Sequence, residues 1–287
     1  MLDVIHIGYA KSASTLLQNA FSAHPALDMV NSRPFTRPLL FNDENVFDSS
    51  ALRGLASDAT DKVRILSDEG LCGWSFFYNY SRIARRLSET FPDARILILV
   101  REQSRFLESL YRHELGFGYG FSAERFIRSY CEHRNVFHGL SYDRVLAEYR
   151  GRFANVHLEL MERVVGPQAE PAALESLFGF IGVSVPEIDV SAPANQGMTA
   201  LSTGLTHVIN RLSGSKLQMF DRTRIYNAWR YRWSRRVDRL ARIGGRTASY
   251  SFPAEIAADI RRRFAVNNKA LAEALGVDVG RWGYAVD

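Results

Sequence analysis

The sequence predicts an α/β protein built around a parallel sheet, and three observations support this prediction. Short apolar runs alternate with helical patterns through about the first 180 residues. The run Ile96–Val100 (ILILV) is continuously apolar, which is typical of a central parallel strand covered on both faces. After Pro193 the pattern is helical throughout. Alternating strands and helices form a parallel sheet with right-handed crossovers, so we expect a sheet core followed by a helical part.

The first two strands are expected at Val4–Gly8 and Val63–Ser67, each a short apolar run. Apolar residues at helical spacing follow the first strand closely, at Leu16, Leu17, Ala20 and Phe21. After the second strand, Ser81 is expected to cap a helix that Pro92 ends.

The third and fourth strands are expected at Ile96–Val100 and Val156–Leu160. Three helices are expected between them, at about Gln103–Leu115, Ala123–Glu132 and Tyr142–Arg150. A further helix over Pro171–Ile181 follows the fourth strand, with Gly182 at its C-terminal end.

The region after Pro193 has no obvious strand. Its helical patterns are Leu201–Leu212, Phe220–Ile243 and Pro253–Leu275. They are expected to form either a helical cap or a small helical subdomain. Val185–Asn195, rich in Pro and Ala, is the expected linker. We therefore expect one domain over residues 1–287, with an α/β core at 1–184 and a mainly helical part at 196–287.

Composition limits the class of protein. The chain has 287 residues, of which 46% are apolar and 23% charged, which excludes a largely disordered chain. Cys72 and Cys131 are too few for a disulfide framework, and their separation is not a metal-ligand spacing. No apolar run approaches the roughly 20 residues needed to span a bilayer, and the N-terminus lacks a signal-peptide pattern. We expect a cytoplasmic protein.

The positive charge is concentrated in one segment. The formal net charge is +5, but Arg211–Arg246 alone holds eleven Lys or Arg against two Asp, a balance of +9. The rest of the chain is mildly acidic. This distribution disfavours a uniformly basic nucleic-acid binder, so no nucleic-acid partner is expected.

A loop of small and hydroxyl residues joins the first strand to the first helix: Lys11, Ser12, Ala13, Ser14 and Thr15. Small residues let the backbone approach an anion closely, and the helix N-terminus adds free N–H groups and a positive dipole end. The loop therefore predicts a phosphate-like ligand. The alternative is a Ser-capped helix with a solvent-facing lysine.

A second set of polar residues follows the most apolar strand. Arg101 stands at the strand end, and Arg105 and Ser109 lie four apart on one face of the next helix. The opposite face is the expected packing stripe, formed by Phe106, Leu107, Leu110 and Tyr111. Two guanidinium groups and a hydroxyl predict a second anion site, near the first if the two strands are neighbours. The alternative is a surface face on which Arg105 pairs with a nearby glutamate.

Together the two motifs, K-S-x-S-T and R-x-x-x-R-x-x-x-S-x-Y, resemble the cofactor signatures of sulfotransferases that use 3′-phosphoadenosine-5′-phosphosulfate (PAPS). The Arg101-to-Ser109 interval of eight residues matches the family. Leu158–Glu162 is similar to a family strand that ends in an acidic residue, and Phe264 to Trp282 resembles the bacterial carbohydrate-type members. The resemblance implies a P-loop-like three-layer fold with a central parallel sheet and a helical C-terminal cap.

The resemblance also implies which residues hold the sulfuryl donor. The loop residues that would bind the 5′-phosphosulfate are Lys11, Ser12, Ala13, Ser14, Thr15 and Leu16. Arg101, Arg105 and Ser109 would bind the 3′-phosphate. Lys11 would also stabilise charge on the leaving-group oxygen in an in-line transfer, for which no metal is required.

The chain departs from the family pattern at three positions, where Ala10, Ala13 and Gln103 stand in place of Pro, Gly and Pro. If the family glycine needs a positive φ angle, Ala13 is strained; if it needs only a small side chain, Ala13 serves. Ala10 also stands where a nucleotide-kinase loop requires Gly directly before the lysine.

A general base must take the proton of the acceptor. In related sulfotransferases the end of the second strand supplies it, which makes Glu69 the first candidate and Asp68 the reserve. His113, one turn beyond Ser109, is a third candidate. The alternatives are an exposed, turn-capping carboxylate for Glu69 and a half-buried helix residue for His113. His6, within the first strand, is expected to be structural.

Aromatic and arginine residues interleave in the basic segment, at Trp229-Arg230-Tyr231-Arg232-Trp233. This pattern suits a sugar ring or an acidic oligosaccharide, and equally an anionic membrane surface. The alternatives are arginines that close over the cofactor phosphates, or an amphipathic helix whose buried side is Trp229, Trp233, Val237 and Leu240.

The favoured function is sulfuryl transfer from PAPS to a hydroxyl or amine of a carbohydrate or other small-molecule acceptor. A nucleotide or metabolite kinase is disfavoured because the loop lacks Gly-Lys and no acid is clearly placed to hold Mg²⁺. A non-catalytic nucleotide- or glycan-binding module is the third hypothesis.

Overall fold

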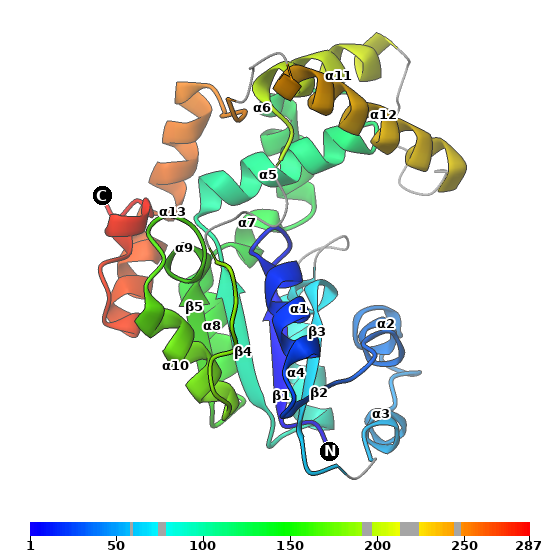
Figure 1. The fold of residues 1–287 in the computed structure, drawn as a ribbon, viewed down its shortest axis with the longest axis vertical. Coiled ribbons are helices and arrows are strands. Elements are labelled where there is room, and N and C mark those ends of the chain that lie inside the picture. Colours follow the sequence, from blue (N-terminus) through cyan, green and yellow to red (C-terminus); the bar gives the residue numbers. More distant parts are fainter. Residues whose placement is uncertain (58–59, 74–78, 191–196, 213–223, 244–247) are drawn as a thin grey trace. The chain divides into compact units, whose positions relative to one another are not determined.

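The computed structural model describes residues 1–57, 60–73, 79–190, 197–212, 224–243 and 248–287, with the side chains of 224–231 left out. A five-stranded sheet forms the core, in the order β2-β3-β1-β4-β5 (Figure 1). Its strands, which all pair in parallel, are β1 (Val4–Gly8), β2 (Leu27–Met29), β3 (Val63–Asp68), β4 (Arg95–Val100) and β5 (Val156–Leu160).

Helices make up most of the remaining described chain. They are α1 (Ser14–Ala23), α2 (Arg33–Phe41), α3 (Ser49–Leu55), α4 (Tyr80–Thr90), α5 (Gln103–Gly116), α6 (Ala123–Arg125), α7 (Val136–Gly139), α8 (Tyr142–Arg150), α9 (Met161–Val164), α10 (Pro171–Ile181), α11 (Ala200–Leu212), α12 (Arg224–Ile243) and α13 (Ala254–Leu275). Single turns of 3-10 helix lie at η1 (Glu69–Cys72) and η3 (Val279–Trp282), and a π-helical turn spans Phe126–Cys131.

The predicted α/β fold with a central parallel sheet is confirmed. The four expected strands are present, and β3 and β4 are each one residue longer than expected. Helices α8 and α10 have the expected bounds, and Gly182 ends α10 with a φ of 90°. The expected helix over Ala123–Glu132 is instead α6 followed by the π-helical turn.

The expected cap at Ser81 is wrong. Helix α4 begins at Tyr80, two residues before the start that a cap at Ser81 predicts. Its N-cap is Asn79, whose side chain accepts a hydrogen bond from the backbone N–H of Arg82. Asparagine is as strong an N-cap as serine, and Asn79 directly precedes Tyr80, the first buried residue of the helix. Strand β2 and helices α2 and α3 were not expected, because a three-residue strand and two short helices show no clear period.

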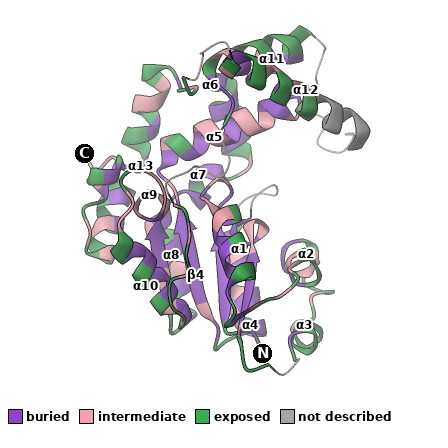
Figure 2. Cartoon of the chain, viewed as in Figure 1, coloured by how far each residue is buried: buried purple, intermediate pink, exposed green. Residues whose placement is uncertain are grey.

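Both faces of the sheet are buried. On one face, α1 and α10 pack over β1, β3 and β4, where Phe21 meets Phe178 with ring centroids 6.0 Å apart. On the other face the alternate strand residues, such as Ile7 and Ile98, are also buried, and α4 packs against α8, which contacts β5. Figure 2 shows the strands coloured as buried. This three-layer arrangement leaves the strand ends as the accessible part of the sheet.

The chain divides into two compact units. The sheet unit consists of Met1–Glu102, His133–Ala194 and Arg263–Asp287, and the helical unit of Gln103–Glu132 and Asn195–Arg262. The expected linker Val185–Asn195 and the expected helix start at Phe220 lie partly outside the described residues. Within those residues no helix is long and apolar enough to cross a membrane, and Cys72 and Cys131 are buried, free thiols.

Candidate active site

Three loops of the sheet unit meet at the carboxyl edge of the sheet. Strand β1 lies between β3 and β4, and all three run in the same direction, so their C-terminal ends lie side by side. From β1 the chain continues to the β2–β3 side of the sheet, whereas from β4 it continues to β5. Ligands of open α/β sheets bind at such a reversal of strand order. The residues that follow these strands include Lys11, Glu69 and Arg101.

The loop after β1 begins at a position that requires glycine. A methyl group at Gly8 would lie 2.5 Å from the Oγ of Ser14. The Ser14 hydroxyl is itself buried and donates a hydrogen bond to the Tyr9 carbonyl over 3.1 Å. The Ser12 N–H also donates to that carbonyl, over 3.1 Å. The loop therefore folds tightly back from the strand into the helix.

Two non-glycine residues of this loop adopt left-handed backbone conformations. The φ angle is 67° at Lys11 and 58° at Ala13. Each such residue costs on the order of 1–3 kcal/mol, and strain of this kind concentrates at functional sites. Ala13 stands where the resemblance expects glycine, and the structure shows that this position does need a positive φ.

The alternative of a Ser-capped helix is wrong. The N-cap of α1 is Ala13, which makes no side-chain cap hydrogen bond, and Lys11 is only partly exposed. The backbone N–H groups of the first turn therefore face the loop without a capping side chain. The Ser12 hydroxyl is fully buried, and its oxygen has no hydrogen-bond partner among the described residues. A buried polar atom without a partner is unusual in a folded protein.

Arg101 joins the end of β4 to the β1 loop. Its Nη1 donates a hydrogen bond to the Lys11 carbonyl over 2.9 Å. Its own carbonyl accepts a hydrogen bond from the Tyr142 hydroxyl over 2.7 Å. The expected proximity of the two strand ends is thereby confirmed for Arg101.

A buried glutamate fixes the turn after Arg101. Glu162 accepts hydrogen bonds from the Glu102 N–H (3.0 Å) and from the Tyr284 hydroxyl (3.2 Å). The sequence indicated an acidic residue after β5, but not that it would hold the end of β4. The anchoring tyrosines, Tyr142 and Tyr284, come from distant parts of the chain, and no local pattern identifies them.

Glu69 is the first residue after β3 and is partly buried. Its burial is the largest influence and raises the pKa of the carboxyl above its ordinary value. The charge of Lys11 and the neighbouring Ser14 hydroxyl lower this pKa, and the charge of Asp68 raises it, with a net increase. Glu69 therefore lies within electrostatic reach of the lysine of the β1 loop.

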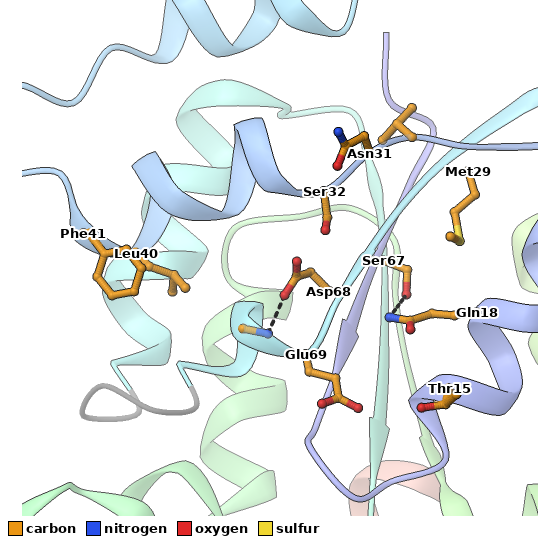
Figure 3. A pocket seen from close by; sticks show the side chains of 12 residues that line it. Thr15, Gln18, Met29, Asn31, Ser32, Leu40, Phe41, Ser67, Asp68 and Glu69 are labelled. Carbon is orange, nitrogen blue, oxygen red and sulfur yellow. Dashed lines mark hydrogen bonds between the residues drawn. The ribbon is translucent and has the colours of Figure 1, made fainter. Parts of the chain in front are cut away.

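Asp68, directly before Glu69, caps the turn that follows β3. Its Oδ1 accepts a hydrogen bond from the Gly70 N–H over 2.7 Å, which caps the 3-10 turn η1. In Figure 3 the two carboxylates leave the strand end in different directions. The turn-capping carboxylate is thus Asp68, and the interpretation of Glu69 as an exposed cap is wrong.

His6 lies beneath this site and is fully buried. Its Nδ1 and the Nε2 of Gln18 both lie within hydrogen-bond distance of the Ser67 hydroxyl, at 2.8 and 3.2 Å. Burial lowers the pKa of His6 to about 4, so the ring is neutral at pH 7. These contacts support the structural role expected for His6.

The second motif continues into the helical unit. Arg105 on α5 is exposed, and Ser109 and His113 are partly exposed. The expected packing stripe of α5 is confirmed, because all of its members are buried: Phe106, Leu107, Leu110 and Tyr111. The His113 ring lies 4.8 Å from that of Phe117. The assignment of Arg105, Ser109 and His113 to a cofactor or to catalysis stays a prediction.

A pocket of about 780 Å³ opens beside Glu69 in the sheet unit (Figure 3). Its lining comes from the first turns of α1, the segment after β2, the end of α2 and the end of β3: Thr15, Gln18, Met29, Val30, Asn31, Ser32, Leu40, Phe41, Ser67, Asp68, Glu69 and Gly70. Amides, hydroxyls and two carboxylates line it, together with the partly exposed ring of Phe41. Thr15 and Glu69 link the pocket to the β1 loop.

Two arginines of α4 hold the end of α2 that forms one wall of this pocket. Arg82 donates to the Leu40 carbonyl over 2.6 Å. Arg86, whose side chain is fully buried, donates to the carbonyls of Leu39 (3.0 Å) and Asn42 (2.6 Å). Cationic side chains thereby satisfy the last carbonyls of α2. The sequence did not reveal this wall, because neither β2 nor α2 was expected.

The aromatic–arginine segment is only partly described. The side chains of Trp229, Arg230 and Tyr231 lie outside the described residues. Trp233 and Val237 are half-buried, but Leu240 is 69% exposed. The expected burial of Leu240 is therefore wrong.

One comparison with a solved structure supports the fold. No protein-family model matches the chain, and no curated protein does. Among solved structures, a sulfotransferase from Alicyclobacillus acidocaldarius aligns with a TM-score of 0.51 and 18% identity, covering 79% of this chain and 98% of the other. Mouse sulfotransferase SULT7A1, solved in complex with PAP, aligns with a TM-score of 0.43 and 11% identity, covering 96% and 89%. At this identity, the first likeness shows that the chain shares its fold with a bacterial sulfotransferase.

Proposed function

We propose that this protein is a sulfotransferase that moves the sulfuryl group of PAPS to a hydroxyl or amine of a carbohydrate or other small-molecule acceptor. One observation carries the proposal. The loop with Lys11, the carboxylate Glu69 and the guanidinium of Arg101 follow three adjacent parallel strands, beside an open pocket. A cation for the leaving group and a base for the acceptor are the two groups that in-line transfer needs.

The β1 loop suits the 5′-phosphosulfate. Its uncapped α1 N-terminus offers backbone N–H groups and a positive dipole end to an anion. The buried Ser12 hydroxyl without a partner and the Thr15 hydroxyl are additional donors. The strained φ angles at Lys11 and Ala13 are consistent with a loop built to surround a ligand.

In the proposed reaction, the bond between sulfur and the bridging phosphate oxygen breaks as the acceptor oxygen or nitrogen bonds to sulfur. The Lys11 ammonium stabilises the negative charge that develops on the bridging oxygen. Glu69 accepts the proton that the acceptor loses. Its raised pKa brings the carboxylate nearer to neutral pH and makes it a stronger base than an ordinary glutamate.

The 3′-phosphate is assigned to Arg101, Arg105 and Ser109. A guanidinium fork matches a phosphate in charge and geometry. The hydrogen bonds that hold Arg101 at the end of β4 orient it before any ligand arrives.

The pocket beside Glu69 is the proposed acceptor site. Its lining includes Asp68 and Glu69 but no Lys or Arg. Carboxylates repel anionic groups, so neutral or cationic acceptors are favoured over uronic acids and other acids. Hydroxyl and amide groups suit a polyhydroxylated acceptor, and Phe41, which is 48% exposed, offers a ring face.

Ligand-induced stabilisation tests the assignment of the donor. A thermal-shift experiment with 3′-phosphoadenosine-5′-phosphate should raise the Tm of the full chain, and ATP with Mg²⁺ should leave it unchanged, because only the former carries a 3′-phosphate. The opposite result would favour the kinase hypothesis. A non-catalytic binding module would be stabilised in the same way but would not consume PAPS in the presence of any acceptor.

A further inference from the structure

Helix α11 of the helical unit turns its apolar side outward. Four of its apolar side chains are exposed: Leu205 by 45%, Val208 by 52%, Ile209 by 37% and Leu212 by 81%. The buried residues of the same helix are polar: Ser202, Thr203, Thr206 and Asn210. A helix on a protein that contacts only water has the opposite arrangement.

Hydrogen bonds hold α11 in this orientation. The Asn210 side chain donates to the Leu115 carbonyl (2.7 Å) and the Tyr119 carbonyl (3.0 Å), both buried within the helical unit. The Ser202 hydroxyl donates to Asp238 of α12 over 2.8 Å. Rotating the helix to bury its apolar side would break these bonds. The exposed stripe is thus a stable feature of the unit.

Helix α12 presents a basic face. Its buried residues in the described part are Ser234, Asp238 and Ala241. Its exposed arginines are Arg232, Arg235, Arg236 and Arg239. The apolar residues Leu240 and Ile243, exposed by 69% and 76%, lie among them.

The outward sides of α11 and α12 belong to one layer. The two helices pack against each other and both pack against α5, so the sides that face away from α5 lie on the same side of the unit. Figure 2 shows exposed residues along the described parts of both helices. From residue 197 to 243 the sequence holds two acidic residues, of which Asp238 is buried and Asp221 lies outside the described residues.

From these observations we infer that the outer layer of α11 and α12 docks on an anionic lipid surface. Exposed Leu, Val and Ile side chains enter the interface between headgroups and acyl chains, and the arginines bind the headgroup phosphates. A second copy of this chain fits less well, because the four arginines of one copy would face the same arginines of the other. The inference rests on the helical unit alone and not on the proposed function.

Vesicle sedimentation with the full chain tests this inference. The protein should bind vesicles of phosphatidylcholine mixed with phosphatidylglycerol, and bind vesicles of phosphatidylcholine alone much more weakly. Binding should fall with added salt, because the arginine contribution is screened.

Two variants separate the apolar from the basic contribution. L205S/V208S/L212S and R232Q/R235Q/R236Q/R239Q should each lower the partition coefficient on anionic vesicles by about tenfold or more. The first variant loses apolar side chains that enter the interface, and the second loses four charges that the headgroup phosphates attract. The matched controls are V46S/L55S/V266S, which replaces residues of similar exposure, and R128Q/R261Q/R262Q/R281Q, which removes the same charge from other exposed positions. Both controls should bind like the wild type.

Three outcomes would overturn the inference. The first is that the protein binds neutral and anionic vesicles equally, or binds neither. The second is loss of binding in the charge control as large as in the α12 variant, which would indicate non-specific attraction. The third is a dimer in light scattering that L205S/V208S/L212S dissociates, which would assign the layer to a second copy. None of these results bears on binding of 3′-phosphoadenosine-5′-phosphate, so the proposed function is tested separately.

Discussion

Helix α11 of the helical unit and the helices of the sheet unit bury opposite kinds of residue. In the sheet unit, helices α1 and α10 bury apolar side chains such as Leu17 and Phe178 on the sheet. In the helical unit, α11 buries Ser202 and Asn210 and exposes Leu212. Hydrophobic burial orients the helices of the first unit, whereas hydrogen bonds to buried carbonyls and to Asp238 orient α11. An apolar stripe therefore identifies the buried side of a helix only where no other force decides its rotation.

Among the variants that compare the two units, the largest effect is expected in the sheet unit, at Lys11. Lys11→Ala should lower kcat by about two to three orders of magnitude, because it removes the cation from the leaving-group oxygen. It should also weaken binding of 3′-phosphoadenosine-5′-phosphate. The control is Lys62→Ala, at an exposed position before β3, which should leave both quantities unchanged. Steady-state kinetics and calorimetric titration measure the two effects, and an active Lys11→Ala variant would remove the loop from the mechanism.

Substitutions in α11 sharpen the contrast between the units. Asn210→Leu places an apolar residue at a buried position. It should nevertheless lower the free energy of unfolding by about 1–3 kcal/mol, because the carbonyls of Leu115 and Tyr119 lose their hydrogen-bond donor. Leu205→Gln, on the exposed side, should change it by less than about 0.5 kcal/mol. Urea unfolding measures both. If Asn210→Leu stabilised the protein, hydrogen bonding would not set the orientation of α11.

The pH dependence of turnover should report the environment of Glu69. The base acts only when deprotonated, so kcat/KM should rise with pH through the pKa of Glu69, which burial raises above its ordinary value. Because the folded protein holds this proton more tightly than the unfolded chain, the Glu69 contribution to stability is lost as pH rises through the same window. A pH–rate profile compared with that of Glu69→Asp measures the effect. A flat profile from pH 4 upward would exclude Glu69 as the base.

The smallest effect is expected from relief of strain in the β1 loop. Ala13→Gly should raise the free energy of unfolding by about 0.5–1 kcal/mol, because glycine adopts the φ of 58° without a penalty. Ala23→Gly, at the exposed end of α1, should instead lower it by about as much, through the lower helix propensity of glycine. Thermal unfolding compares the two. If both variants lowered the free energy of unfolding, the conformation of Ala13 would carry no strain.

The sequence predicted the parts of the fold that have a strong local signal. The apolar runs of β1, β3, β4 and β5, which alternate with helical patterns, predicted a parallel sheet. Gly182 predicted the C-terminal end of α10. Strand order then followed only from the structure, yet it is what brings Lys11, Glu69 and Arg101 to one edge. From the sequence, a second anion site beside the first requires the first and third expected strands to be neighbours, and β1 and β4 are paired.

The pocket could not be predicted, for a physical reason. Two of its four walls are the segment at the end of β2 and the end of α2. These elements are short, and the end of α2 is held by distant contacts, above all the hydrogen bonds of Arg86. Likewise the contact of Tyr142 with Arg101 joins residues far apart in the sequence. Local periodicity carries no information on such pairs. The positive φ at Ala13 was anticipated only as one of two alternatives.

Consumption of PAPS by the wild type and by Glu69→Gln tests the central claim most directly. With neutral sugars or amino sugars as acceptors, the wild type should release 3′-phosphoadenosine-5′-phosphate, and Glu69→Gln should do so about two to four orders of magnitude more slowly with unchanged cofactor affinity. Turnover in Glu69→Gln equal to that of the wild type would contradict the assignment of the base. Absence of any PAPS binding by the wild type would contradict the proposed function itself.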